Sequence, residues 1–305
     1  MNGSPLVVWL GTTMILDRSE AEGFGLLALT TFVASAINSV AGGGTILTFP
    51  VLAALLPDGP ARLVTANATS TIGLWPGSVA AAWGYRSQRD GMPPWTGWLL
   101  PASIVGACLG SLLVLALPPQ WFSRAVPWLI LAAALLFALQ PRLSAVVRSP
   151  AAIENVSGAR AHPDGRPSAA MLAAAWVLQF LVAVYGGYFG AGIGILMLAV
   201  LGCLDLGDIH KLNSVKNVLA MAVNGTTALM FAAAAALPAG AVLGPWGGTI
   251  GPGVVSWWHA GVMAIASVLG GLFGATIARR LPATLVRRAV ALIGFALAGY
   301  YFLGV

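Results

Sequence analysis

The sequence predicts an all-α integral membrane protein, built from two inverted-topology repeats of about five helical segments each. Three observations support this fold class. Hydrophobic residues make up 58% of the chain and charged residues only 8%, and the mean hydropathy of +0.88 is too high for a water-soluble domain. A polar, glycine-rich break interrupts an apolar run near the start of each half. The basic residues collect in alternate gaps between the apolar runs.

The two breaks are copies of one element. The first runs from Asn38 to Thr45 and the second from Tyr185 to Gly194. Each separates two apolar arms that are shorter than the ~20 helical residues needed to cross a bilayer core. A glycine-broken helical hairpin is therefore expected to open each repeat, and the sequence leaves open whether it fully spans the membrane or is re-entrant. At an offset of 150 residues the aligned pairs are Gly42 with Gly192, Gly44 with Gly194, and Asn67 with Asn217.

The other apolar runs follow the same order in both halves. The segments expected in the first half are Phe24 to Val40, Ile46 to Leu56, Leu63 to Tyr85, Trp95 to Leu117 and Val126 to Leu139. Those expected in the second are Ala169 to Tyr185, Ile195 to Leu204, Leu212 to Leu237, Trp257 to Ala278 and Leu285 to Leu303. The expected organisation is an extracytoplasmic tail (1–23), repeat 1 (24–140), a polar cytoplasmic linker (141–168) and repeat 2 (169–305).

A second internal match supports the duplication. The stretch from Ala102 to Gly110 resembles the stretch from Ala266 to Gly274, at an offset of 164 residues. The larger offset is explained by a proline- and glycine-rich insertion from Pro238 to Pro252. Repeats at this spacing are typical of transporter folds that arose by duplication.

The basic residues predict the topology. If each broken pair of helices returns to the side it came from, 12 of the 15 Lys and Arg residues share one side and 3 face the other. If each broken run crossed once, the split would be 7 against 8. The positive-inside rule favours the first arrangement, which places both termini outside the cytoplasm and inverts the second repeat. The two hairpin tips are then expected to meet near the midplane.

The hairpin tips are the expected binding site. Non-helical backbone at membrane depth is tolerated only where it is buried in protein or lines a wet cavity. New helices start near Thr45 and Ile195, and their unpaired N–H groups and dipoles favour an anion. The helix after each break adds polar side chains at helical spacing. The residues expected to bind the substrate are Asn38, Ser39, Gly42, Gly43, Gly44, Thr45, Asn67, Ser70, Thr71, Tyr185, Gly190, Gly192, Gly194, Asn213, Lys216 and Asn217.

Some polar residues and glycines inside the apolar segments can be interpreted as structural instead of substrate-binding. Lys216 lies a turn inside an apolar segment, where a charge is costly. It either recognises the anion or carries its charge to the cytoplasmic surface on its long stem. Asn224 is interpreted as bonding a neighbouring helix. The glycines in G-x-x-x-G spacing are interpreted as close helix contacts: Gly106, Gly110, Gly270 and Gly274.

Composition also excludes several classes of function. All nine acidic residues fall in expected tails or loops, so no carboxylate relay for sodium or protons crosses the core. The three scattered histidines predict no metal site, and no cofactor is expected. The +6 charge forms no single stripe, so no nucleic-acid partner is expected. The expected partners are a small anionic substrate and the lipid bilayer, while the coupling ion and a homo-oligomeric state stay open.

Three stretches carry a family resemblance: Ala41 to Thr45 with Pro50, Arg62 to Ser70, and Lys211 to Asn217. They resemble the TauE/SafE-type sulfite and organosulfonate exporters, and the resemblance covers nearly the whole chain. It implies a permease of a bacterial-type inner membrane that moves small sulfur-containing or carboxylated anions, often outward. We therefore expect a secondary transporter working by alternating access, not an enzyme. The alternatives are an anion channel that uses the breaks as a filter and a membrane-embedded enzyme.

Overall fold

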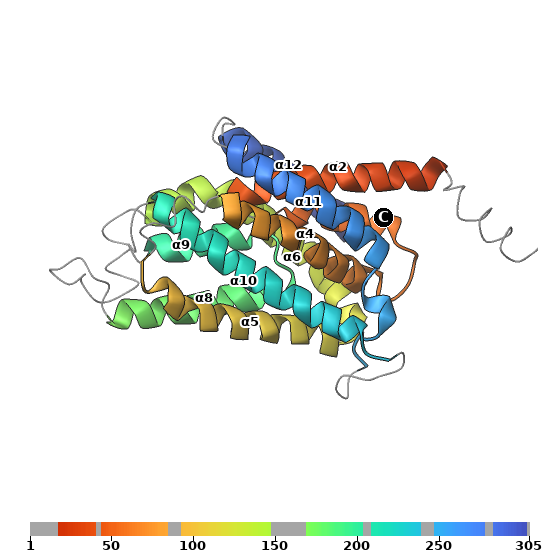
Figure 1. The fold of residues 1–305 in the computed structure, drawn as a ribbon, viewed down its shortest axis with the longest axis horizontal. Coiled ribbons are helices and arrows are strands. Elements are labelled where there is room, and N and C mark those ends of the chain that lie inside the picture. Colours follow the sequence, from red (N-terminus) through yellow and green to blue (C-terminus); the bar gives the residue numbers. More distant parts are fainter. Residues whose placement is uncertain are drawn as a thin grey trace, which may run out of the picture.

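The computed structural model describes residues 18–40, 44–84, 93–147, 169–203, 209–238, 247–277 and 283–303. All regular structure within these ranges is helical, as the sequence predicts (Figure 1). The first half contains α2 (Arg18–Val40), α3 (Thr45–Leu55), α4 (Arg62–Gly84), α5 (Thr96–Ala116) and α6 (Pro119–Val147). The second contains α8 (Ala169–Tyr188), α9 (Ile193–Cys203), α10 (Ile209–Ala235), the short 3-10 helix η2 (Pro252–Val254), α11 (Trp257–Ile277) and α12 (Ala283–Leu303).

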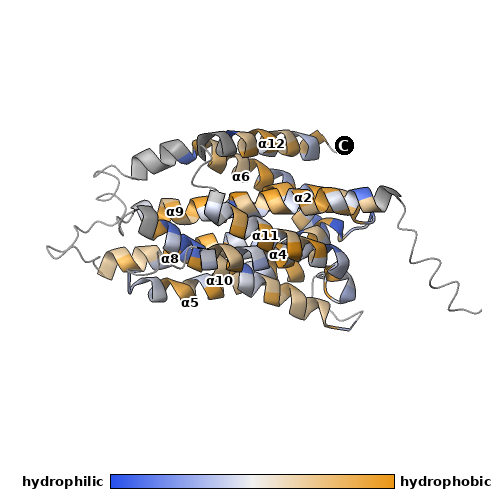
Figure 2. Cartoon of the chain, turned by 45° about the horizontal axis from the view of Figure 1, so that its top comes forward, coloured by the Kyte–Doolittle hydropathy of each residue, from blue (hydrophilic) through white to orange (hydrophobic). Residues whose placement is uncertain are grey.

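Six of the described helices are long and apolar enough to cross a membrane. Their outer surfaces carry exposed apolar side chains such as Leu29, Trp98, Leu181 and Ile265, which a bilayer would cover. Figure 2 shows α2 hydrophobic along most of its length and hydrophilic at its N-terminal end. The six spans are Ala21–Ser39, Thr96–Ala116, Pro119–Gln140, Ala169–Tyr188, Leu212–Ala235 and Trp257–Gly274.

The helix α4 departs from the sequence prediction. The run from Leu63 to Tyr85 does form a helix, but α4 is not among the six membrane-spanning candidates. Polar residues such as Asn67, Ser70 and Ser78 lower its hydropathy, and all three are buried. A helix that faces other helices instead of lipid can carry polar side chains. The low hydropathy and the burial of these residues therefore indicate that α4 is a central element of the bundle.

Each glycine-rich break joins two helices that fold back on one another. A side chain on Gly44 would overlap the carbonyl oxygen of Ala34, and one on Gly23 would lie 2.9 Å from the Leu55 side chain. The end of α3 therefore returns toward the start of α2, as a hairpin requires. Both α3 and α9 have 11 residues, a length of about 16 Å. That is roughly half of a hydrocarbon core, so neither short arm spans a membrane alone.

The helix contacts occur in matching pairs. The helix α11 packs on α2 and α4, and correspondingly α5 packs on α8 and α10. The short helix α3 contacts α12 as α9 contacts α6. The helices α4 and α10 contact each other, and so do α6 and α12. Most helix contacts in the first half therefore have a counterpart in the second half, made by the helices at the corresponding positions in the chain.

Both ends of the bundle can be followed in Figure 1. The helices α4, α6, α9 and α11 end at the left of that view, where α5, α8, α10 and α12 begin. Three arginine-rich stretches of the sequence lie around the ends of α4, α6 and α11: Arg86 to Arg89, Arg142 to Arg166 and Arg279 to Arg288. The helices that flank these stretches thus present their ends at the same pole of the bundle. The starts of α4 and α6 lie at the opposite pole.

Glycines form the closest helix contacts, as the sequence predicts. In the first half, a side chain on Gly110 would overlap the carbonyl oxygen of Val184, and Gly106 meets α8 one turn earlier. In the second half, Gly270 lies against the backbone of Phe32 and Gly274 against α2 near Ala36. The four G-x-x-x-G glycines therefore let α5 approach α8, and α11 approach α2, to backbone distance.

The helix α6 is longer at both ends than the sequence predicts. It begins at Pro119, not Val126, because proline fits the first turn of a helix and its missing N–H is not needed there. It ends at Val147 and so runs seven residues into the segment expected as a linker from residue 141. The rest of that segment, 148–168, lies outside the described residues.

Candidate functional site

A small polar pocket lies where the flanks of the two breaks meet. Its wall comes from four helices: the C-terminal end of α2, the second half of α4, the start of α9 and the middle of α10. Its volume of about 10 Å³ is room for roughly one water molecule. The lining residues are Asn38, Ser78, Ala81, Ile193, Gly194, Lys216, Asn217 and Ala220. The sequence prediction that the two breaks approach each other is thus matched by a shared pocket.

Lys216 is the cationic group of this pocket. It lies inside the apolar span Leu212–Ala235, and only 1% of its surface is exposed. This burial excludes the interpretation in which its stem carries the charge to the cytoplasmic surface. A buried ammonium needs compensating polar or negative groups, because removing it from water costs several kcal/mol. An anion in the pocket would add one more compensating group to those around Lys216.

Asn217 adds an amide that the protein leaves unsatisfied. Its side chain lines the pocket, is 8% exposed, and has no hydrogen-bond partner for Nδ2 within the described structure. A buried donor without a partner costs about 1–3 kcal/mol. An acceptor entering the pocket, such as the oxygen of an oxyanion, would remove that cost.

Ser78 is a pocket residue that sequence reasoning missed. Its Oγ accepts hydrogen bonds from Asn38 Nδ2 and Asn224 Nδ2, each at 3.4 Å, and donates to the Leu74 carbonyl oxygen at 3.4 Å. All three contacts are long for hydrogen bonds of these kinds, so another acceptor could displace them at low cost. The spacing in the sequence could have identified Ser78, since it lies two helical turns beyond Thr71 on the same face of α4.

The first break contributes less to the pocket than the sequence predicts. Gly42 and Gly43 lie outside the described residues. Gly44 packs against Ala34 and Thr45 begins α3, and neither lines the pocket. Ser39 donates to the Ala36 carbonyl oxygen at 2.8 Å and faces Gly274 of α11. These side chains and backbone groups build the hairpin, and Asn38 alone of this stretch reaches the pocket within the described structure.

The polar residues after the first break tie helices together. Asn67 Nδ2 donates to the Tyr188 carbonyl oxygen at 3.1 Å, which joins α4 to the second break. Ser70 Oγ and Thr48 Oγ1 are 2.8 Å apart, which joins α4 to α3. Thr71 Oγ1 donates to the Asn67 carbonyl oxygen of its own helix at 2.8 Å. None of Asn67, Ser70 and Thr71 lines the pocket, because their hydrogen bonds point elsewhere.

The second break is a tight turn that directs Gly194 toward the pocket. Tyr185 Oη donates to the Ala191 carbonyl oxygen at 2.6 Å and so closes the turn. Gly190 and Gly192 have φ values of 79° and 77°, a backbone region that residues with a Cβ rarely adopt. Tyr185, Gly190 and Gly192 therefore shape the break, while Gly194 touches the pocket. On the following helix, Asn213 lies one turn before Lys216 with its Oδ1 buried and without a partner, but it does not line the pocket.

The fold and the pocket define a class of protein: a multi-pass α-helical membrane protein that holds a cationic, polar pocket between two broken helices. The model of the TauE/SafE sulfite exporter family matches residues 27–301. The chain belongs to this family of membrane transporters.

Two relatives extend over almost the same length. A "Probable membrane transporter protein" of Haemophilus influenzae is 27% identical over 280 residues, covering 90% of this chain and 93% of that protein. A "Probable membrane transporter protein ORF9" of a Sinorhizobium species is 27% identical over 283 residues, covering 90% of this chain and 92% of that protein. No solved structure matches the chain significantly.

Proposed function

We propose that the protein is a secondary transporter for a small oxyanion. The substrate class is sulfite, a sulfonate or a related sulfur-containing or carboxylate anion, because the family is described by sulfite export. The observation that carries the proposal is the pocket that joins both breaks to Lys216 and Asn217. A buried ammonium beside an unsatisfied amide donor suits a ligand that is negative and has several acceptor oxygens.

The substrate would contact a subset of the residues predicted from the sequence. Asn38, Lys216, Asn217 and the backbone at Gly194 would hold the anion, and Ser78 would join them. The remaining predicted residues would act indirectly, by fixing the hairpins. The pocket has room for about one water molecule in this conformation. Binding a larger anion would therefore require α2 and α4 to separate from α9 and α10.

The separation of α2 and α4 from α9 and α10 would be part of an alternating-access cycle. We propose that the halves are inverted repeats, which the paired contacts of α11 with α2 and α5 with α8 support. Motion of one half against the other would open the pocket first to one side and then to the other. The pole where α4, α6, α9 and α11 end would face the cytoplasm, because arginine-rich stretches follow α4, α6 and α11. Both termini would lie outside.

Flux through proteoliposomes tests the proposal. Vesicles that contain the protein and unlabelled sulfite are expected to accumulate labelled sulfite by exchange, with a rate that saturates as external sulfite rises. The same assay with taurine and with acetate defines the substrate class. A current that does not saturate at low concentration would instead indicate a channel, and chemical conversion of the anion would indicate an enzyme. Either outcome would overturn the transporter proposal.

A further inference from the structure

A second polar cavity lies at the opposite pole from the arginine-rich stretches. It is an open cleft of about 430 Å³ between the turn that joins α3 to α4 and the first turns of α6. Its polar side chains are Asp58, Arg62, Gln120, Ser123 and Arg124. The cleft shares no lining residue with the central pocket, so it is a separate place on the molecule.

The charge of this cleft is positive. Arg62 forms an ion pair with Asp58 four residues earlier, and the Asp58 side chain is 91% exposed. Arg124 is exposed and forms no ion pair with any carboxylate in the described part of the chain. Two guanidinium groups therefore share the cleft with one water-exposed carboxylate. Because the Arg62 pair is an exposed one, it is weak, and an external anion can compete with Asp58 for it.

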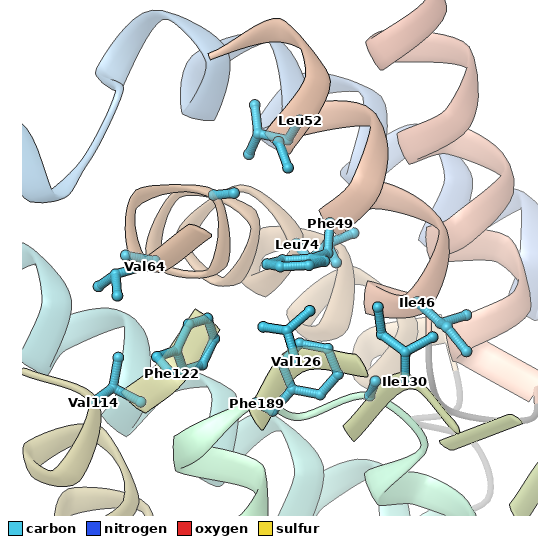
Figure 3. Packing of buried hydrophobic residues seen from close by; sticks show 14 of the residues in the cluster. Ile46, Phe49, Leu52, Val64, Leu74, Val114, Phe122, Val126, Ile130 and Phe189 are labelled. Carbon is cyan, nitrogen blue, oxygen red and sulfur yellow. The ribbon is translucent and has the colours of Figure 1, made fainter. Parts of the chain in front are cut away.

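The start of α6, which carries Arg124, is anchored in the apolar core. Phe122, which lies between Gln120 and Ser123 in α6, is 2% exposed and turns into the core. Its ring centroid is 5.5 Å from that of Tyr188 and 6.3 Å from that of Phe189. Figure 3 shows Phe49, Phe122 and Phe189 among other apolar side chains of α3, α4 and α6. Phe122 thus packs the first turns of α6 against the core, and the same turns carry the exposed Arg124.

We propose that this cleft is a second oxyanion-binding site, held by Arg62 and Arg124. Guanidinium groups bind anions that present two or more oxygens in one plane, through paired N–H donors. The ligand class is accordingly a sulfate, sulfonate or phosphate group. Such a group reaches this pole either as a free anion in water or as the headgroup of an anionic lipid. Gln120 supplies an additional amide donor in the lining of the cleft.

Binding to the purified full-length protein separates these two sources. In nanodiscs of zwitterionic lipid, sulfate is titrated and its heat of binding measured. In a second arm, phosphatidylglycerol retained by the detergent-purified protein is counted by native mass spectrometry. Arg124→Gln and Arg62→Gln are compared with Arg288→Gln, which removes an exposed arginine of α12 outside both cavities. Both cleft substitutions are repeated in a Lys216→Ala background, in which binding of sulfate at the central pocket is weakened.

The expected result is that each cleft substitution weakens sulfate binding, lipid retention or both by about tenfold or more. Asp58→Asn, which removes the competing carboxylate, is expected to strengthen binding by about two- to fivefold. Arg288→Gln should leave this binding as in the parent. The cleft substitutions should weaken sulfate binding in the Lys216→Ala background as well, which keeps a failure here distinct from a failure of the transport proposal. If Arg124→Gln and Arg62→Gln match the parent in both arms, the cleft binds no oxyanion.

Discussion

Replacing Lys216 with alanine is expected to weaken the binding of small oxyanions by about ten- to a hundredfold. Lys216 is 1% exposed and lines the central pocket beside Asn217. A hydrogen bond between charged partners is stronger in such a site than in water, because the surrounding dielectric constant is low. Titration of sulfite, ethanesulfonate and acetate against the purified protein, followed by thermal shift, measures the change.

Two further substitutions make this result interpretable. Lys216→Met keeps a long apolar stem and removes only the charge, so the same loss of affinity with a normal unfolding temperature assigns the effect to the ammonium. Lys216→Arg retains the charge and is expected to keep part of the affinity. If Lys216→Ala and Lys216→Met both bind every anion as the parent does, the lysine has no part in recognition and backbone groups alone would have to hold the substrate.

Replacing Gly110 with leucine is expected to prevent stable folding. Gly110 lies where α5 crosses α8, and even a Cβ atom there would overlap the Val184 carbonyl oxygen. Backbone atoms on both sides leave no flexible side chain to move aside, so the two helices must separate. The smaller change Gly110→Ala should cost about 1–3 kcal/mol, as overpacking of a core does. Yield of monodisperse protein and unfolding temperature measure both effects.

Matched glycines provide the controls for this prediction. Gly270 makes the equivalent contact between α11 and the Phe32 backbone, so Gly270→Ala should destabilise the protein by a similar amount. Gly261 lies in α11 with no atom near the position of a Cβ, so Gly261→Ala should be neutral or slightly stabilising. Equal unfolding temperatures for Gly110→Ala and Gly261→Ala would contradict the packing described for α5 and α8.

Much of the fold followed from patterns that physical chemistry makes visible in the sequence. The glycine-rich breaks and the two G-x-x-x-G pairs were recognisable, because glycine in an apolar run has few roles other than a turn or a close contact. The polar face of α10 was recognisable from the spacing of Asn213, Lys216 and Asn217, which lie three and four residues apart. The helix α4 was less visible as a central element, because burial within protein, unlike burial in lipid, tolerates satisfied polar groups.

The individual contacts of the site could not be predicted in the same way. A serine or threonine in a helix can bond a carbonyl of its own helix, another helix or a ligand, and its sequence context is the same in each case. Ser39 and Thr71 bond their own helices, Ser70 bonds α3, and Ser78 reaches the pocket. Which hydroxyl serves which partner depends on how α4 is rotated against α2 and α10, and no local pattern specifies that rotation.

The most direct test of the account is whether water reaches the central pocket from each side of the membrane. Ala220 lines that pocket, whereas the neighbouring Leu219 is fully buried in the apolar core. In protein whose native Cys108 and Cys203 are replaced by alanine, Ala220→Cys is expected to react with a small, membrane-impermeant thiol reagent from both sides, and an anion should slow the reaction. Leu219→Cys should stay unreactive. If Ala220→Cys is as unreactive as Leu219→Cys from both sides, the pocket is sealed packing and no substrate passes through it.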